Sequence, residues 1–351
     1  MTTQAKRIFV IGGTGAQGIP VITALVKDKK YHCRVLTRDP TSARAQALVA
    51  LGNVDLVEGT YASEADLRKG YRGCEGAFAI RSYEIALEEG IRFFVYGNLD
   101  YGYKKGGYDP KFRCGHYDGK GRVGEWILAQ NQQNSSRMGA ALFTTGPYME
   151  MSIAKGTPMT PTVEEGGVVT WKVPLGQGAV PHVALDDCGY YVPWLFDHQD
   201  RANGLDLAVA IDHIDYHELA RAFEKVTGHP ARYVDIDLDA YWESGPLSKA
   251  ASQGAGYNTD SRDPASMTVR QNFTGFWNLW KHSGGNKGVV RRDYKLLDEI
   301  HPNRIRTAEE WFIKETEKGI AAGKGSLWDR VQPDKLKPVL KIAEDGRRGR
   351  L

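Results

Sequence analysis

In the first half of the chain, short apolar runs alternate with segments in which apolar residues recur at helical spacing. Residues 7–11 are rich in β-branched side chains, and residues 19–26 then place apolar residues on one helical face. This alternation is typical of βαβ units, in which helices connect parallel strands. Further strands are predicted at 32–37, 54–57, 75–80, 91–96 and 140–145, and further helices at 41–51, from Ser63, and at 116–132.

Six such strands with right-handed crossovers predict an α/β fold with a Rossmann-type, doubly wound parallel sheet. We expect residues 1–150 to form the nucleotide-binding domain. Residues 151–351 are expected to form a smaller mixed α/β region, interleaved with the first, that binds a substrate or a partner. The connection at 81–90 is near the lower limit for a crossover with its helix. Either its loop is absent or a segment is missing from the sequence, and we favour the second.

The second half has a different pattern. Residues 168–173 and 179–185 are predicted to form a hairpin, after which Asp186 and Asp187 cap a helix that continues to Phe196. An aromatic stripe on one helical face is typical of a core, although beside a cofactor it would also wall a pocket for a planar substrate. The stripe consists of Phe273, Phe276, Trp277 and Trp280.

Composition and charge exclude several classes of protein. The net charge of +3, from 46 basic and 43 acidic residues, is too balanced to indicate a nucleic-acid or membrane partner. No signal peptide or membrane-spanning run is recognised, and four cysteines without a Cys-x-x-Cys pair fit a reducing compartment, so we expect a cytoplasmic protein. Cys114 and His116 have no second ligand pair at zinc spacing, so no metal site is predicted.

A glycine-rich loop, Gly12-Gly-Thr-Gly-Ala-Gln-Gly18, separates the first predicted strand from the first helix. Gly12 permits the tight turn, Gly15 lets a pyrophosphate approach the backbone, and Gly18 lets the helix pack closely on the strand. The N-terminus of the helix would offer N–H groups and its positive dipole end to the phosphates. The loop therefore predicts a dinucleotide site.

The residues after the second strand indicate which dinucleotide binds. An NAD site commonly has a carboxylate there to bind the ribose hydroxyls, whereas this chain has Arg38, preceded by Thr37. A guanidinium can pair with a 2′-phosphate through two charge-assisted hydrogen bonds. We interpret Asp39 as a helix-start residue and predict NADP(H) as the cofactor.

These motifs resemble those of the NmrA-like family, atypical members of the short-chain dehydrogenase/reductase superfamily that are related to isoflavone reductases. Members known as enzymes reduce carbonyls or double bonds of small natural products with NADPH, and others bind NADP(H) and act as regulators. The resemblance therefore bears more on the cofactor than on the activity. The matching stretches are 11–18, 36–40, 94–96, 116–120 and 301–312, the last of which looks like the C-terminal segment of fungal members.

The resemblance implies cofactor contacts at the ends of successive strands. Thr60 and Tyr61 stand near the adenine, where many relatives have an aspartate. Tyr148 is expected near the nicotinamide, as packing or as an alternative proton donor. Asn98 stands where reductases often have a serine that polarises the carbonyl, or it closes a turn. The implied contacts to the pyrophosphate and the 2′-phosphate are Gly12, Thr14, Gly15, Gln17, Gly18 and Arg38.

Lys120 matches the superfamily lysine that binds the nicotinamide ribose and lowers the pKa of a proton donor. Reductases carry Tyr-x-x-x-Lys, one helical turn apart, whereas here His116 is four before Lys120 and Tyr117 is three before it. His116, with an ordinary pKa of about 6.5, is a candidate donor at neutral pH. Tyr117 is one only if Lys120 and the cofactor lower its pKa from about 10. Alternatively, His116 only starts the helix while Lys120 binds ribose.

Two functions follow from these observations. In the first, which we favour, the protein is an NADPH-dependent oxidoreductase that reduces a carbonyl, enone or quinone-like group in a small aromatic natural product. A related alternative is an isomerase or dehydratase that keeps the cofactor as a structural element. In the second, it is a non-catalytic NADP(H)-binding redox sensor that acts through a protein partner. The tryptophan-rich second half favours the enzyme, and the loss of Tyr-x-x-x-Lys favours the sensor.

Overall fold

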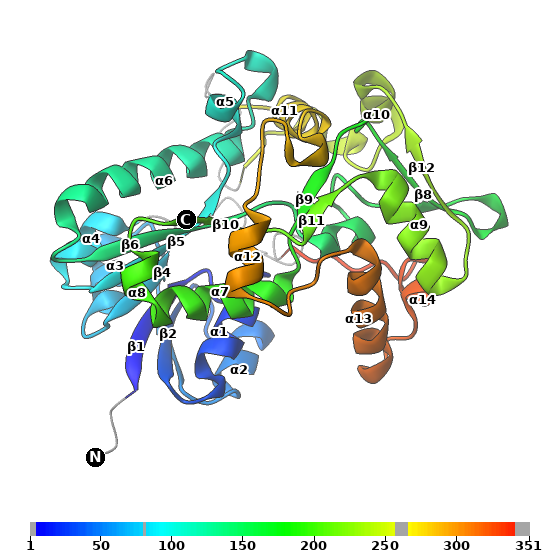
Figure 1. The fold of residues 1–351 in the computed structure, drawn as a ribbon. Helices are drawn as coiled ribbons and strands as arrows, with labels where there is room; N and C mark the ends of the chain where they lie inside the picture. The colour runs from blue at the N-terminus through cyan, green and yellow to red at the C-terminus, as the bar shows by residue number, and fades with distance from the viewer. Residues whose placement is uncertain (1–4, 80–81, 257–265, 341–351) are drawn as a thin grey trace.

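The computed structural model describes residues 5–79, 82–256 and 266–340. A seven-stranded parallel sheet organises the first half of the chain (Figure 1), with strand order β10-β6-β5-β4-β1-β2-β3. The chain order reverses between β1 and β4, so the predicted doubly wound sheet is confirmed. Its strands are β1 Lys6–Ile11, β2 Tyr31–Thr37, β3 Val54–Glu58, β4 Gly76–Ala79, β5 Phe93–Leu99, β6 Gly139–Thr145 and β10 Asp206–Ala208.

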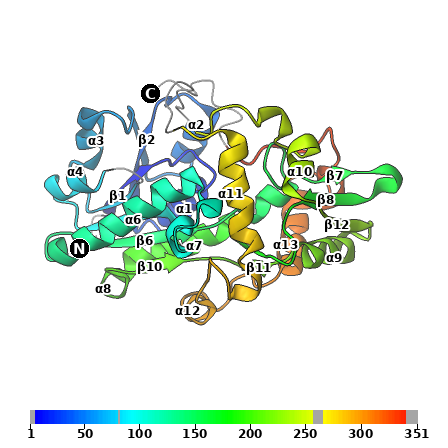
Figure 2. The same ribbon diagram turned by 90° about the horizontal axis from the view of Figure 1, so that it is seen from above.

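Helices cover both faces of this sheet, with α1, α2 and α7 on one face and α3, α4 and α6 on the other (Figures 1 and 2). Strand β1 shows why both faces must be covered. Ile8 and Val10 pack in a core with α1 and α7, whereas Phe9 and Ile11 pack in a second core with α3 and α6. The bounds are α1 Gly18–Lys27, α2 Ala43–Val49, α3 Glu64–Tyr71, α4 Tyr83–Glu88, α6 Gly115–Asn134 and α7 Leu185–Asp197.

The connection between β4 and β5 contains the short helix α4. Ile80 and Arg81, where the predicted connection begins, lie outside the described residues. The predicted helix start at Ser63 is confirmed, because the Ser63 side chain accepts a hydrogen bond from the Asp66 N–H at the beginning of α3.

The second half builds two small sheets. Strand β8 (Val169–Val173) lies between β7 (Thr162–Val163) and β12 (Ala231–Asp235), and β9 (Val180–His182) pairs antiparallel with β11 (Asp212–Ile214). The predicted hairpin of 168–173 and 179–185 is therefore wrong, because each of its strands pairs elsewhere. The link between them packs against the end of α11, where the Ala179 N–H donates to the Trp280 carbonyl (3.2 Å) and directs β9 away from β8.

Helix α7 begins at Leu185, before the two aspartates that were predicted to cap it. Its N-cap position is Ala184, and Asp186 and Asp187 lie in the first helical turn without capping it, so the predicted cap is wrong. The reason is that a side chain from another segment binds the helix start: the Leu185 N–H donates to Glu150 Oε1 (3.1 Å).

The aromatic stripe lies on α11 (Val269–Lys281) and forms part of a third core, in the second half of the chain. Phe276, Trp277 and Trp280 are buried, and Phe273 is partly buried against them. The core interpretation of the stripe therefore holds for three of its four residues. The remaining helices are α5 Gly102–Lys105, α8 Gln199–Ala202, α9 Tyr216–Thr227, α10 Leu238–Ser244, α12 Tyr294–Ile300, α13 Ala308–Ala321 and α14 Leu327–Arg330.

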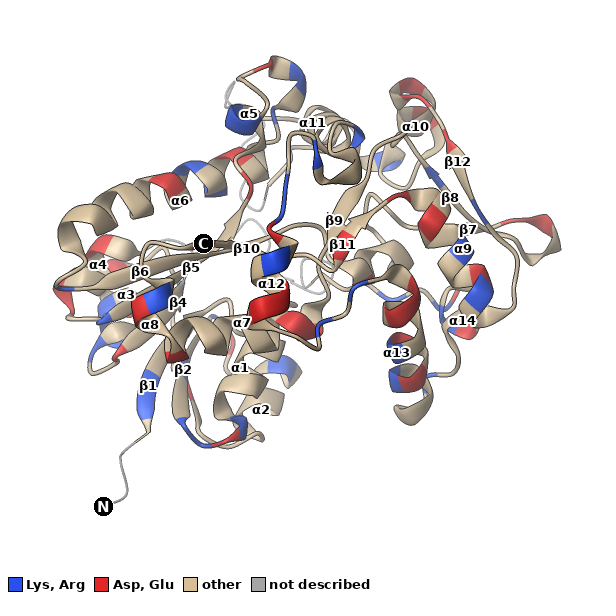
Figure 3. Ribbon diagram, in the orientation of Figure 1, with Lys and Arg blue, Asp and Glu red and all other residues tan. Residues whose placement is uncertain are grey.

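The second half also contributes to the large sheet and its cover. Strand β10 extends the sheet beside β6, α7 packs along α1, and Leu297 and Ile300 of α12 join the core on that face. Basic and acidic residues are interspersed along the outer helices (Figure 3). Within the described ranges, no helix is long and apolar enough to span a membrane, and no group of three His, Cys, Asp or Glu residues is placed to hold a metal ion.

Candidate active site

The predicted cofactor residues lie at the carboxyl ends of neighbouring strands. Residues 12–17 leave β1 and enter α1, next to the point where the strand order reverses between β1 and β4. Arg38 and Thr60 follow β2 and β3 at the same edge. Open α/β sheets bind ligands in the crevice at this switch point.

The geometry of the loop requires glycine. A Cβ on Gly18 would lie 2.4 Å from the Gly12 carbonyl oxygen, and one on Gly15 would lie 3.1 Å from it. Gly12 itself has a φ of +80°, a conformation that favours glycine. Helix α1 receives no side-chain hydrogen bond from its N-cap residue Gln17, and Thr14 is buried beside the loop. This uncapped helix start beside a glycine-rich loop fits a pyrophosphate.

Two arginines lie close to the loop. Arg38 is half-buried directly after β2. Arg44, in the first turn of α2, places Nη1 3.5 Å from the Thr14 carbonyl oxygen. The Asp39 carboxylate accepts hydrogen bonds from the Thr41 N–H (2.9 Å) and hydroxyl (2.6 Å), which fits its interpretation as a helix-start residue. Sequence reasoning missed Arg44, although its position one turn into the helix after Arg38 was a usable signal.

Thr60 and Tyr61 follow β3 and are both partly buried. The Thr60 N–H donates to Asp66 Oδ2 (3.0 Å), so α3 holds this turn in place. The Tyr61 ring packs against the core beneath α3 and α6. Their role at the adenine stays a prediction.

Helix α6 places Lys120 one turn after His116. Lys120 is half-buried, and burial lowers its pKa to about 8. Its ammonium has no ion pair or hydrogen bond with any side chain in the described part of the chain. A cation so placed is available to hydroxyl groups of a ligand.

His116 is held by its Nδ1 atom. The side-chain amide of Asn272 on α11 lies 2.9–3.1 Å from Nδ1, and Cys114 Sγ lies 3.4 Å from it. His116 as a residue is exposed, and Phe273 lies beside its ring with ring centroids 5.5 Å apart. The surrounding protein and the Lys120 charge lower the pKa of His116 below its ordinary value. The imidazole is therefore neutral at pH 7. In this form it can hydrogen-bond a ligand, but it is a weaker proton donor than the imidazolium ion.

Tyr117 belongs to the core of the second half. Its ring packs against Phe276 and Trp280, with centroids 6.2 and 5.6 Å away, and burial raises its pKa well above the ordinary value. Besides burial, the groups that act on this pKa are Cys114, Asp100, Arg292 and Tyr148, so the role of Tyr117 as a proton donor stays a prediction. Of the two candidate donors, His116 is the more accessible.

Asn98, at the end of β5, is buried under α6. Its amide donates to Thr144 Oγ1 (2.9 Å), which in turn donates to the Asp206 carboxylate. A Cβ on Gly124 would lie 2.9 Å from Asn98 Oδ1, so a glycine of α6 lets the helix lie directly on this residue. Asn98 thus connects β5 with β6, and its role toward a carbonyl stays a prediction.

Tyr148 lies between the two halves of the molecule. It follows β6 and packs, partly buried, against both the core on the α1 face and the core of the second half. Burial raises its pKa, and the nearby Cys188 and Glu150 add to the increase. The position at the end of β6 fits the prediction that it borders the nicotinamide, which stays untested.

A fully buried ion pair that sequence reasoning missed joins the halves near this site. Asp100 follows β5, and its carboxylate accepts from both terminal nitrogens of Arg292 (2.7 and 3.0 Å). Lys105 Nζ lies 2.6 Å from the same carboxylate. Burial raises the pKa of Asp100, but these two cations outweigh it and hold the pKa well below its usual range. The residues are 192 positions apart, and no local motif marks them.

A sequence model of the NmrA-like family matches residues 4–248. The chain belongs to the NmrA-like family. It is 28% identical over 358 aligned positions to the NmrA-like family domain-containing oxidoreductase malD of Malbranchea aurantiaca, an alignment that covers 91% of this chain and 99% of the relative. The oxidoreductase lnaB of Aspergillus flavus is 27% identical over 67% of this chain and 77% of its own length.

Solved structures share the NmrA-like fold. The negative transcriptional regulator NmrA in complex with NAD superposes with a TM-score of 0.69 at 14% identity, over 93% of this chain and 99% of that one. An NADPH-dependent quinone oxidoreductase of Escherichia coli, complexed with NADPH, gives a TM-score of 0.63 at 20% identity, over 88% and 99% of the two chains. The neighbours thus include proteins that bind NAD and proteins that bind NADPH.

Proposed function

We propose that this NmrA-like protein binds NADP(H) and reduces a carbonyl, enone or quinone-like group in a small aromatic natural product. The observation that carries the proposal is the glycine-lined loop at the switch point of the sheet, with Arg38 and Arg44 beside it. Two guanidinium groups at this edge favour a cofactor with a 2′-phosphate. The oxidoreductase names of the fungal relatives support the reaction type.

When bound, the reduced nicotinamide supplies the hydride. Lys120 lies one helical turn after His116, and its ammonium, which has no side-chain partner among the described residues, would bind the ribose hydroxyls. His116 would hydrogen-bond the substrate oxygen through Nε2, which has no partner among the described residues, while Asn272 fixes the ring through Nδ1. Which nitrogen of His116 carries the proton depends on the orientation of the Asn272 amide, since both amide atoms lie within hydrogen-bond distance.

The test is a calorimetric titration with NADPH and NADH in parallel. We expect NADPH to bind at least about tenfold more tightly than NADH, which corresponds to ~1.4 kcal/mol. Arg38→Ala should remove most of this difference, whereas Arg221→Ala, an exposed position on α9, should leave it unchanged. Equal affinities for the two dinucleotides in the native protein would contradict the cofactor proposal.

A second candidate function is a redox sensor that binds NADP(H) without turnover. Two observations favour it: His116 replaces the tyrosine of Tyr-x-x-x-Lys, and the structural neighbour NmrA is a transcriptional regulator. Lys120→Ala and His116→Phe separate the candidates once a substrate is identified in a carbonyl screen. If both variants keep native turnover, the acid–base scheme is wrong. If NADP⁺ binds far more tightly than NADPH and no substrate is turned over, the sensor is supported.

A further inference from the structure

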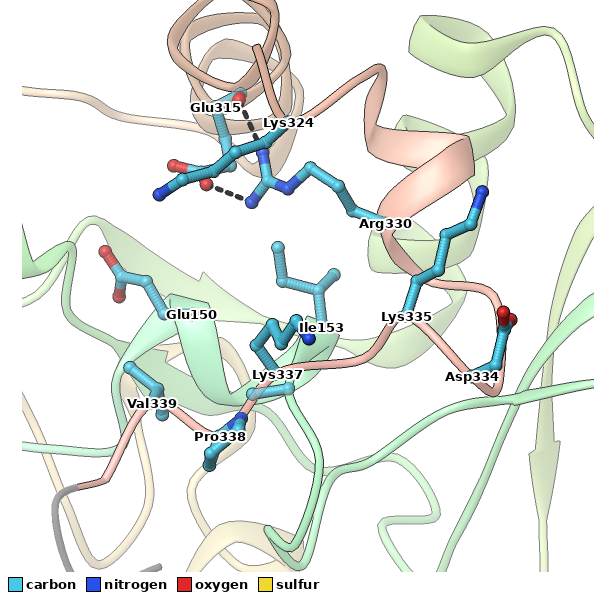
Figure 4. Close-up of a pocket in the computed structure, with 11 residues that line it drawn as sticks. Glu150, Ile153, Glu315, Lys324, Arg330, Asp334, Lys335, Lys337, Pro338 and Val339 are labelled. Atoms are coloured by element: carbon cyan, nitrogen blue, oxygen red, sulfur yellow. Dashed lines mark hydrogen bonds and ion pairs between the residues drawn. The ribbon is translucent and has the colours of Figure 1, made fainter. Parts of the chain in front are cut away.

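A cavity of about 540 Å³ lies between the segment after β6 and the C-terminal segment that follows α14 (Figure 4). Its floor is the short 3₁₀ helix η2 (Met149–Ile153), which begins directly after Tyr148. The cavity therefore starts two residues from the side chain that we place at the nicotinamide. Part of its wall is apolar, formed by Ile153, Ala154, Pro338 and Val339.

Three lysines of the cavity, Lys324, Lys335 and Lys337, have no ion pair with any described residue. Arg330 is already neutralised by Glu315, whose carboxylate and carbonyl it binds. In Figure 4 Lys324 extends toward the side on which Glu150 lies, Lys337 ends near the centre of the view beside Ile153, and Lys335 extends away on the other side.

Glu150 supplies a hydrogen-bond donor to the same space. Its Oε1 accepts from the Leu185 N–H, while its buried Oε2 has no hydrogen-bond partner among the described residues. Burial raises the pKa of Glu150 to about 8, so the group is mostly protonated at neutral pH. The titratable and charged groups near it are Tyr148, Asp186, Cys188, Glu315 and Lys318, and the other charged residues that line the cavity are Lys324, Arg330, Asp334, Lys335 and Lys337.

We propose that this cavity is the substrate pocket and that it selects substrates with a carboxylate on an apolar body. Lys324 and Lys337 attract the carboxylate, the Glu150 carboxyl donates a hydrogen bond to it, and the apolar wall packs against the body. This proposal rests on the proposed function only in so far as the molecule bound in the cavity is the one that is reduced. The preference for a carboxylate stands on the cavity alone.

The test uses 2-naphthoate and its uncharged isostere 2-naphthamide as probes, titrated at pH 7 with and without saturating NADPH. We expect the naphthoate to bind about tenfold more tightly than the amide, and more tightly with NADPH than without it. The double variant Lys324→Gln/Lys337→Gln should weaken naphthoate binding about tenfold, because each exposed lysine contributes modestly. The same variant should change the naphthamide affinity by less than about twofold. The matched control Lys335→Gln should change neither the naphthoate affinity nor the naphthamide affinity by more than about twofold.

The pH dependence tests the role of Glu150. Naphthoate affinity should fall about fivefold or more between pH 7 and pH 9, because Glu150 loses its proton near pH 8 and then repels the carboxylate. Glu150→Gln keeps a donor at the same place, so it should retain the affinity at pH 7 and lose this pH dependence. An unchanged pH profile in the variant would overturn the role of Glu150.

The outcomes separate the two proposals. Equal binding of naphthoate and naphthamide overturns the carboxylate pocket, whether or not NADPH binds. Selective naphthoate binding that NADPH does not affect overturns the assignment as the substrate pocket. Failure of NADPH to bind, with selective naphthoate binding retained, overturns the proposed function and leaves the carboxylate pocket standing.

Discussion

The missing side chain at Gly18 sets how closely α1 approaches β1. An added Cβ would lie 2.4 Å from the Gly12 carbonyl oxygen, and backbone cannot give way cheaply. We expect Gly18→Ala to weaken NADPH binding by at least about tenfold and to lower the melting temperature, measured by calorimetry and by thermal unfolding.

Gly119 provides the matched control. It lies exposed in α6, where a Cβ would meet nothing within 4 Å. Gly119→Ala should therefore stabilise the protein by roughly 0.5–1 kcal/mol through helix propensity. If the two alanine variants behaved alike, close approach at Gly18 would not be the cause.

The position of Lys120 carries a cost in stability. Its pKa falls to about 8 on folding, so below pH 8 the native state holds a poorly solvated charge that the unfolded state hydrates fully. Lys120→Met should raise the free energy of unfolding of the cofactor-free protein at pH 7 by up to ~3 kcal/mol, and its melting temperature should rise accordingly. This advantage should shrink as pH rises from 8 toward the unfolded pKa, because neutral Lys120 has no charge to desolvate.

NADPH affinity should change in the opposite direction, since the same variant loses the contact that we propose between Lys120 and the ribose. Thermal unfolding from pH 6.5 to 9.5, with and without NADPH, measures both effects. A variant that is less stable at pH 7 would show that Lys120 has a charged partner.

At the residue scale, the sequence predicted arrangements of residues that are close together in the chain. Gly12, Gly15 and Gly18 lie within one loop, and His116 and Lys120 lie one turn apart, so spacing was sufficient to find them. Asn272 was missed because it is 156 positions from His116 in the sequence. It also lies on the same helix as the aromatic stripe, which was the more conspicuous pattern there. The lowered pKa of His116 was missed for the same reason, since its surroundings come from the tertiary structure.

At the scale of elements, the Asp100–Arg292 pair fastens the end of β5 to the segment before α12. Removing one partner leaves the other charge buried, which typically costs ~3–5 kcal/mol. We expect Asp100→Asn and Arg292→Met each to destabilise by roughly this amount. The double variant should be destabilised by clearly less than their sum, measured as a double-mutant cycle in urea. Additive effects would show that the two groups act independently.

The elements themselves were predicted where periodicity is strong. The six strands of the first half are short apolar runs with glycine or polar boundaries, and all six were found. Strand β10 was missed because it has only three residues. The false hairpin arose because strand propensity is local, whereas the partners of β8 and β9 are set by packing of the distant α11.

At the scale of the whole molecule, the two halves share their cores. Strand β10 and helices α7 and α12 all come from beyond residue 150, and they complete the sheet and cover its α1 face. We expect the fragment 1–150 to be unfolded or aggregated by circular dichroism and size-exclusion chromatography, since this face would be exposed. The intact chain should unfold in one cooperative thermal transition. A soluble fragment with a sharp transition would show that residues 1–150 fold on their own.

The two outer strands of the large sheet also affect how the protein behaves in concentrated solution. A long, flat strand at the rim of a sheet exposes unpaired backbone groups that can pair with another chain and start aggregation. Here one rim is the three-residue β10, and the other is β3, on which Asp55 and Glu58 are exposed. Brevity protects one rim and negative charge protects the other, so neither offers a template on which further strands can add.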